Sequence, residues 1–287
     1  MRRCVLLSAV KPYGGFLLGS AIALCMATGM VEQSSLLILS CSALILLAGL
    51  PHGAYDWVIM RACYQDGRLA AVILGYLALA LSVLGLWWIA PQALLIAFLT
   101  YSAFHFGDSD FPNASRLHQV SWGMAIIGLP GLLAAADVEA LFSLLTQGST
   151  APMLIDLLAV LGSLAAVVHV AAAPRRWLSL AVLTVYGAVC WASGALLAFA
   201  CYFALLHSPV HLARWRNTFN QQGSKIILAL SFAVIAAIAG AVWISTSGIA
   251  LTVETVNQAT FRYTFIALAA LTVPHMVLLS IANARVQ

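Results

Sequence analysis

Charged side chains are scarce in this sequence. Of its 287 residues only 8% are Asp, Glu, Lys or Arg, whereas 63% are hydrophobic. A soluble domain carries about 25% charged residues, so this chain lacks the polar side chains that would cover a surface facing water. The composition therefore excludes an ordinary soluble protein and predicts a chain whose solvent is mostly lipid.

Several motifs of known chemistry are also absent. No basic cluster is interleaved with aromatic residues, so the net charge of +4 does not indicate a nucleic-acid partner. The sequence has no HExxH, GxSxG or GxGxxG, which leaves zincin, serine hydrolase and dinucleotide-binding functions without a motif. The six cysteines are scattered and form no CxxC, as expected of small packing residues in apolar segments. No fixed repeat or long linker interrupts the chain, which predicts a single domain over residues 1–287.

Long apolar segments dominate what is present, and their lengths suit transmembrane helices. They predict an all-α, polytopic integral membrane protein with about ten transmembrane helices, although the region around residues 178–212 also allows a count of nine. The segments lie at about residues 15–31, 34–49, 70–90, 91–107, 119–135, 152–173, 178–192, 194–211, 226–244 and 263–281. The first follows Met-Arg-Arg but has no convincing cleavage site, so we interpret it as a retained span.

The basic residues support the count of ten. With ten spans, twelve of the 13 Lys and Arg residues fall on the side that holds both termini, and only Arg262 falls on the other. Cytoplasmic loops of membrane proteins carry an excess of Lys and Arg. The pattern therefore predicts that both termini are cytoplasmic and that the chain is a multi-pass protein of the cell (inner) membrane.

Histidines occur at the ends of three of these segments. His207 and His211 lie four residues apart in LLHSPVHLAR, on one face of a helix that Pro209 is expected to bend. His52 lies in GLPHGAYD and His105 lies in SAFHFGDSD. All three segments run in the same direction in the ten-span topology, which brings the four imidazoles to one level near the cytoplasmic boundary. We therefore predict a metal site formed by His52, His105, His207 and His211.

Three further residues are candidates for a supporting role in or near this site. Asp56 follows His52 by one helical turn, and Asp108 follows His105. Carboxylates often orient a metal-bound imidazole through its second nitrogen, although these acids could also be solvated loop residues. His275 lies near the middle of the tenth segment, where an ionisable residue suggests function. It could line a substrate pocket, add a fifth ligand or hydrogen-bond a neighbouring helix.

The remaining histidines and the metal type are less determined. His118 and His169 lack such surroundings, and we interpret them as residues at the membrane interface. Imidazole-rich sites suit Zn, Cu, Fe or Ni. Four neutral imidazoles can leave a coordination position open for O₂, which favours Fe(II) without excluding zinc or copper.

Together these motifs resemble a known family. GLPHGAYDW, SAFHFGDSD, LLHSPVHLAR and TVPHM, spread over about residues 50–276, are similar to the Brp/Blh family of β-carotene 15,15′-dioxygenases. The resemblance implies an iron-dependent oxygenase that cleaves the central double bond of β-carotene with O₂ to give two all-trans-retinal. It also implies Fe(2+) held by His52, His105, His207 and His211, substrates drawn from the lipid bilayer, and a functional link to a retinal-binding rhodopsin.

Other classes of function remain open from the sequence. The chain could be a membrane carotenoid or retinal binding or transport protein without catalysis. It could be a haem-binding electron carrier, because axial histidines on neighbouring helices are common in that class. It could also assist another carotenoid enzyme as an accessory partner.

Overall fold

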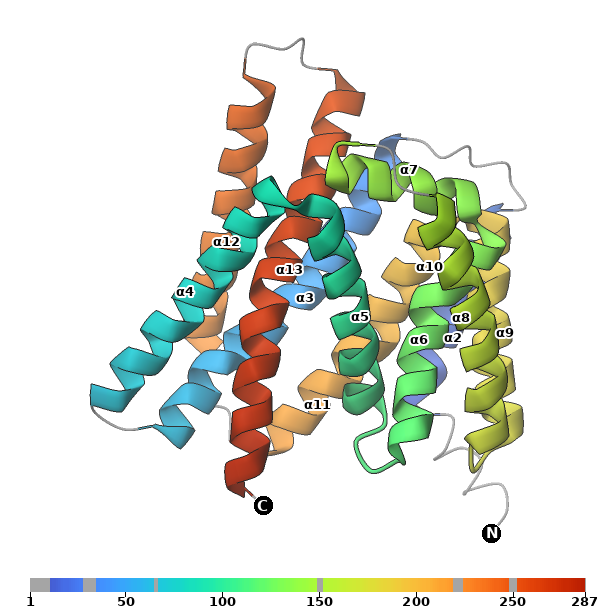
Figure 1. The fold of residues 1–287 in the computed structure, drawn as a ribbon, viewed down its shortest axis with the longest axis horizontal. Coiled ribbons are helices and arrows are strands. Elements are labelled where there is room, and N and C mark those ends of the chain that lie inside the picture. The colour runs from blue at the N-terminus through green and yellow to red at the C-terminus, as the bar shows by residue number, and fades with distance from the viewer. Residues whose placement is uncertain are drawn as a thin grey trace. The chain divides into compact units, whose positions relative to one another are not determined.

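The regular elements of this protein are helices wherever its structure is described. The computed structural model describes residues 11–27, 35–64, 67–148, 152–218, 224–247 and 252–286, and no strand occurs among them (Figure 1). The elements are a 3₁₀ turn η1 (Lys11–Tyr13), α2 (Gly14–Ala27), α3 (Ser35–Cys63), α4 (Gly67–Ile89), α5 (Pro91–Asp110), α6 (Arg116–Leu133), α7 (Ala135–Thr146), α8 (Pro152–Ala172), α9 (Arg176–Ser193), α10 (Ala195–Tyr202), a π-helical segment η2 (Phe203–His207), α11 (Ser208–Thr218), α12 (Ser224–Thr246) and α13 (Val253–Val286).

The chain divides into two compact units. Unit 1 consists of Met1–Leu37 and Leu99–His211, and unit 2 consists of Ile38–Phe98 and Leu212–Gln287. Unit 1 contains α2, the end of α5, α6 to α10 and η2, whereas unit 2 contains most of α3, α4, α12 and α13. The organisation as one domain, expected from the sequence, stays a prediction.

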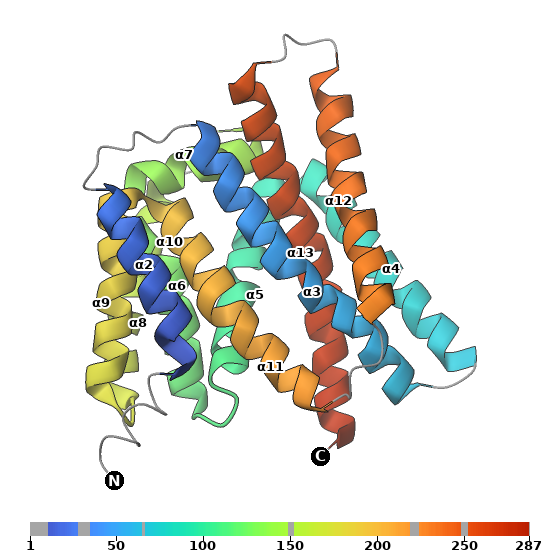
Figure 2. The same ribbon diagram turned by 180° about the vertical axis from the view of Figure 1, so that it is seen from behind.

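Glycines bring the helices of unit 1 into close contact. A Cβ atom added at Gly128 of α6 would overlap the backbone of Gly162 in α8, and the reverse also holds. Figures 1 and 2 show α6, α8 and α9 side by side. Small residues at helix interfaces allow such approach in membranes, where lipid gives helices no hydrophobic reason to associate. Tyr186 of α9 adds a hydrogen bond of 2.9 Å to the carbonyl oxygen of Ile126.

Close packing at glycines also positions the end of α5 that carries His105. An added Cβ at Gly107 would overlap the backbone of Gln119, and one at Gly123 would overlap the carbonyl of Ala103. The two glycines thus hold α5 against α6 on either side of His105. Residues two apart on a helix point in nearly opposite directions, at about 200°. Because Gly107 of α5 packs against α6, His105 points away from α6.

One sharp bend in unit 1 was not expected from the sequence. The predicted fifth segment ends at residue 135, whereas α6 ends at Leu133 and turns through 108° into the 12-residue α7. Pro130 lies in the last turn of α6, and the backbone N–H of Ala134 closes that turn on its carbonyl. The α6–α7 pair is therefore a broken span or a re-entrant hairpin.

Unit 2 is assembled around the long helix α13. In Figure 2, α3 and α12 lie beside α13, and α4 packs against α13 as well. Ile59 and Met60 of α3 form a buried cluster with Leu278 of α13. Leu46 and Leu50 of the same helix cluster with residues of α12 and α13, among them Ile238, Val234 and Tyr263. Pro274 interrupts the hydrogen-bond ladder inside α13, next to His275.

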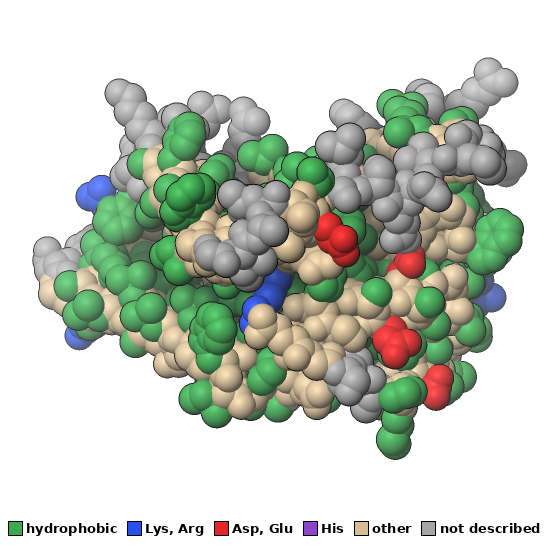
Figure 3. Space-filling view, turned by 90° about the horizontal axis from the view of Figure 1, so that it is seen from above, with side chains coloured by type: hydrophobic (Ala, Val, Ile, Leu, Met, Phe, Trp, Pro, Cys, Tyr) green, Lys and Arg blue, Asp and Glu red, His purple; other side chains and the backbone are tan. Residues whose placement is uncertain are grey.

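The helices are those of a multi-pass membrane protein. Six described helical stretches are long and apolar enough to cross a membrane, and the count rises to seven if α6 and α7 form one span. Two shorter apolar helices, Gly14–Ala27 and Leu37–Leu50, add to these. Hydrophobic side chains cover much of the face in Figure 3, and charged ones are few. Each of the ten predicted apolar segments coincides with a helix for most of its length, while the ten crossings and the cytoplasmic termini stay predictions.

Candidate metal centre

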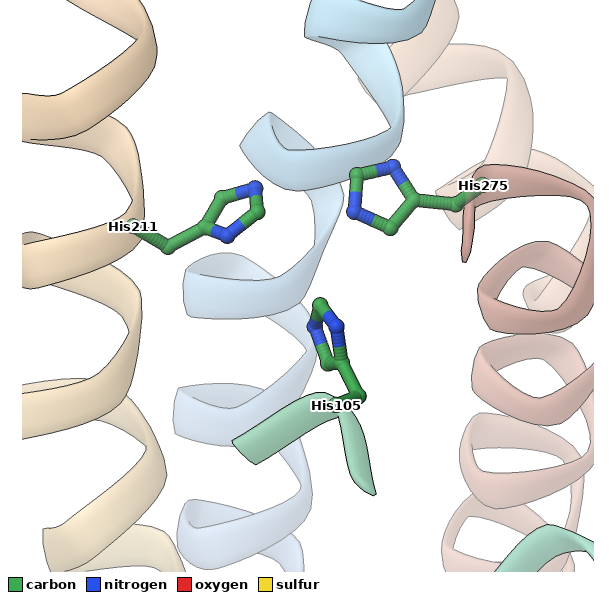
Figure 4. A group of neighbouring side chains, drawn as sticks. All are labelled: His105, His211 and His275. Atoms are coloured by element: carbon green, nitrogen blue, oxygen red, sulfur yellow. The ribbon is translucent and has the colours of Figure 1, made fainter. Parts of the chain in front are cut away.

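Three of the predicted ligands lie together in unit 1. The ring centroid of His105 is 5.1 Å from that of His207 and 5.6 Å from that of His211, and the last two are 6.0 Å apart. All three side chains are buried, with exposed fractions of 7%, 0% and 1%. A ligand nitrogen of His105 lies within 4.8 Å of one of His211, and Figure 4 shows the two rings turned toward each other.

These spacings suit one shared ion. A metal–imidazole bond of about 2.1 Å places the ring centroid about 3.2 Å from the ion, so adjacent ligands have centroids about 4.5–5.5 Å apart. The His105–His207 separation of 5.1 Å lies within that range. The separations of 5.6 Å and 6.0 Å exceed it, the larger by about half an ångström. The three buried imidazoles are therefore a donor set that fits a transition metal such as iron, copper or zinc.

A π-helical segment positions His207. The backbone N–H of Ser208 donates to the carbonyl of Phe203, five residues earlier, and the segment η2 ends at His207 itself. Pro209 has no N–H for the carbonyl of Leu205, so the ordinary ladder cannot continue here. That carbonyl lies against Gly15 of α2, where an added Cβ would stand only 3.2 Å away. Single π-helical turns are frequent at functional sites because they re-aim side chains.

Asp110 fixes the ring of His207. Its Oδ1 lies 2.9 Å from Nδ1 of His207, and its Oδ2 accepts hydrogen bonds from Tyr202 at 2.7 Å and from the indole N–H of Trp122 at 2.8 Å. A carboxylate only accepts, so Nδ1 of His207 carries the proton and Nε2 carries the lone pair. This is the arrangement that orients a metal-bound histidine. The sequence placed Asp110 close to His105 but did not single it out.

The neighbouring acid, Asp108, lies in different surroundings. Its side chain is 45% exposed and stands 3.7 Å from Arg116. Ser109, between the two acids, contacts Nδ1 of His211 at 2.7 Å. The end of α5 thus directs Ser109 and Asp110 to the histidines and Asp108 to the surface, so Asp108 contacts none of the predicted ligands in the contacts described for unit 1.

A tyrosine from the N-terminal turn shares the electrostatic field of Asp110. Burial raises the pKa of Tyr13 to about 12, and the negative charge of Asp110 contributes to the increase while Arg175 opposes it. Tyr13 therefore stays protonated at neutral pH. It adds a neutral polar group near Asp110 and no second negative charge.

Unit 2 contains a second carboxylate–histidine pair. Oδ1 of Asp56 lies 2.6 Å from Nδ1 of His275, and its Oδ2 accepts a hydrogen bond of 2.7 Å from Tyr76. Asp56 and His275 are 1% and 3% exposed. The pattern repeats that of Asp110, with histidine on one oxygen and tyrosine on the other. His275, also labelled in Figure 4, comes from α13 and presents Nε2 as its lone-pair nitrogen by the same reasoning.

His52, the fourth predicted ligand, is carried by α3, the helix that also carries Asp56. Its side chain lies outside the described residues. On a helix the two positions are one turn apart and on one face.

The two histidines that we interpreted as interface residues are buried. His118 and His169 are 3% and 0% exposed, and their rings stack with centroids 4.1 Å apart. Phe111 and Trp122 complete this cluster. Trp122 also donates to Asp110, so the stacked pair packs against a residue that holds the carboxylate bonded to His207. The sequence could not reveal this, because the two residues come from different helices, α6 and α8.

The fold and these pairs define a class of protein, a multi-pass helical membrane protein with buried histidine–carboxylate pairs that fit a metal. A family model described as β-carotene 15,15′-dioxygenase matches residues 43–282. The β-carotene 15,15′-dioxygenase of the uncultured marine bacterium 66A03 is 32% identical over 256 residues, which cover 83% of this chain and 90% of that protein. No solved structure matches the chain significantly. The chain belongs to the β-carotene 15,15′-dioxygenase family of enzymes, and the family resemblance noted in the sequence is confirmed.

Proposed function

We propose that this chain is an iron-dependent oxygenase that cleaves the central 15,15′ double bond of β-carotene with O₂. One C40 polyene and one O₂ give two molecules of all-trans-retinal, so each carbon of the broken double bond gains one oxygen atom. Family membership supports the carotenoid substrate, and the buried cluster of His105, His207 and His211 in unit 1 is the single observation that supports a metal.

The proposed ligands are His105, His207 and His211, with His52 as the fourth from the family resemblance. Fe(2+) bound there would supply the activation of O₂ that a spin-allowed reaction with an alkene needs. Asp110 and Ser109 contact Nδ1 of His207 and His211, which would leave Nε2 of each ring to hold the metal. The apolar surroundings exclude water, which protects the aldehyde products and any reactive oxygen species from side reactions.

His275 has two alternative roles in this proposal, and the variant His275→Ala distinguishes them. If His275 is a further ligand, His275→Ala lowers the iron content of the purified protein. If it lines the substrate pocket, the same variant keeps its iron and binds β-carotene more weakly. Asp56 orients the ring in both cases.

The membrane supplies the substrate in this proposal. β-Carotene dissolves in lipid and is about as long as the hydrocarbon core is thick, about 30 Å. We place the chain in the cell membrane with ten spans and both termini in the cytoplasm, as the basic residues predict. Reporter fusions at each terminus test this topology. A retinal-binding rhodopsin is the class of protein that would consume the product.

The test is expression in cells that make β-carotene, followed by chromatography of the pigments and metal analysis of the purified chain. The wild type is expected to replace β-carotene with retinal and to contain iron. Alanine at His52, His105, His207 or His211 should abolish retinal formation and lower the iron content without preventing membrane insertion. His118→Phe, which keeps a buried ring in the stacked pair, is the matched control. Retained β-carotene with no product and no iron would favour the transport or binding alternative.

A further inference from the structure

Unit 2 contains a cavity whose lining includes none of the proposed metal ligands. It has a volume of about 260 Å³ and is lined by residues of α3, α4, α12 and α13. Most of the lining is aliphatic, including Leu50 of α3 and Val234 of α12. Its polar groups are Asp56, Tyr76 and Ser231. An apolar cavity with few polar groups is a common form of small-molecule site.

The cavity runs from a buried floor to an exposed rim. Leu50 and Asp56 at the floor are 5% and 1% exposed, whereas Leu77 of α4 and Leu230 of α12 are 51% and 43% exposed. The apolar windows of α4 and α12 are each only 11% buried, the lowest share among the six candidate spans. In a membrane these exposed faces contact lipid. The rim formed by Leu77 and Leu230 therefore opens toward the bilayer.

The polar groups at the floor do not call for a charged ligand. Asp56 has one oxygen on His275 and the other on the Tyr76 hydroxyl, and that hydroxyl also approaches the carbonyl of Leu271 at 3.4 Å. These groups satisfy each other within the protein, so the occupant needs to bring no hydrogen-bonding group. A neutral hydrocarbon fits such surroundings better than a polar headgroup, whose charge would lose its water there.

The volume indicates the size of the occupant. An apolar cavity of about 150 Å³ accepts benzene, which has six carbon atoms. By proportion, 260 Å³ accepts about ten carbon atoms. The trimethylcyclohexenyl ring at each end of β-carotene has nine.

We propose that this cavity binds one trimethylcyclohexenyl end ring of a carotenoid that enters from the bilayer between Leu77 and Leu230. The inference rests on the proposed function for the identity of the substrate. The cavity then selects carotenoids by their ends, independently of the double bond that is cleaved. Asp56, which orients His275, lines the same cavity.

The test measures binding without cleavage. The full chain is reconstituted in lipid nanodiscs under anaerobic conditions with β-carotene or with lycopene, which has the same carbon number and no rings. Circular dichroism induced in the polyene absorption band reports only pigment held by the protein. The wild type is expected to bind β-carotene saturably and lycopene at least about tenfold more weakly, because lycopene leaves the cavity unfilled.

Two substitutions fill the cavity, and one matched substitution does not. Leu77→Phe at the rim and Val234→Phe in the wall should weaken β-carotene binding about tenfold or more, because overpacking excludes the ring. Leu81→Phe adds the same group one turn further along α4, at a position that is 66% exposed and outside the cavity lining, and should bind like the wild type. Size-exclusion profiles and iron content of the variants identify any that fail to fold.

The results separate this inference from the proposed function. Wild-type affinity for β-carotene in both cavity variants, or equal binding of lycopene by the wild type, would overturn the ring site even if the chain produces retinal in air. A chain that binds β-carotene in the expected pattern but yields no retinal in air would retain the ring site and refute the oxygenase.

Discussion

Asp110 Oδ1 lies 2.9 Å from Nδ1 of His207, although the two residues are 97 positions apart in the sequence. Trp122 and Tyr202 donate to the other oxygen of the same carboxylate. A buried charge with three hydrogen-bonding partners has a fixed position, and it fixes the imidazole in turn. Asp110 thus gives a histidine of an apolar helix the fixed orientation that the proposed metal ligand needs.

Replacement of Asp110 by Asn is expected to lower iron affinity about 10–100-fold, because the amide is a weaker partner for Nδ1–H and can present the wrong tautomer. Competition with a chelator, measured as iron retained per chain, checks this. Asp108→Asn is the matched control at the same helix end, since Asp108 is exposed and faces Arg116. Equal iron loss in both variants would show that the Asp110 contact has no special role.

Removal of a hydrogen-bond donor to Asp110 should lower the free energy of unfolding. Tyr202→Phe leaves the carboxylate buried with one hydrogen bond fewer, at a cost of about 1–3 kcal/mol in the free energy of unfolding. Denaturation in detergent, followed by tryptophan fluorescence, measures the loss. Tyr263→Phe serves as a control, because Tyr263 belongs to unit 2 and its described contacts are with residues of that unit. An unchanged midpoint for Tyr202→Phe contradicts the prediction.

Pro209→Ala is predicted to separate stability from activity. Alanine restores an N–H for the carbonyl of Leu205 and favours a regular helix by up to about 3 kcal/mol. A regular helix would remove the π-helical segment and turn His207 away from Asp110. The variant should therefore be as stable as the wild type or more so, yet lose iron and retinal formation together. Full activity would mean that η2 is not needed to position His207.

Glycine-to-alanine substitutions test how α5 is held. Gly107→Ala and Gly123→Ala each place a methyl group into the backbone of the neighbouring helix, which should cost about 1–3 kcal/mol in stability and displace His105. Lower retinal yield and a lower thermal midpoint are the expected readouts. Gly75→Ala on α4 meets no atom within 4 Å and should have little effect. If all three variants behave alike, close packing of α5 on α6 does not position the site.

The sequence predicts the helices well because they follow from hydropathy alone. The bend into α7 was missed, since Pro130 and the short apolar run after it read as the end of one span. The histidines could be found from HxxxH spacing and from shared helix direction. The sequence could not show that Asp110, rather than Asp108, contacts a histidine. That depends on the direction in which the last turn of α5 faces, which the glycine contacts with α6 set.

The pairing of Asp56 with His275 was likewise beyond the sequence. The two residues are 219 positions apart, and only the packing of α3 against α13 brings them into contact. A helical reading placed Asp56 one turn from His52 and suggested that it served that histidine. Among the described residues, Asp56 contacts the imidazole of His275 and the hydroxyl of Tyr76, and the same reasoning from carboxylate chemistry then applies to His275.

X-ray absorption at the iron edge of the purified, iron-loaded chain shows whether histidines hold the metal. We expect a scattering pattern of several imidazole ligands in the wild type and one imidazole fewer in His211→Ala. An iron environment without histidine, or one that stays the same when His105, His207 and His211 are replaced in turn, would contradict this expectation.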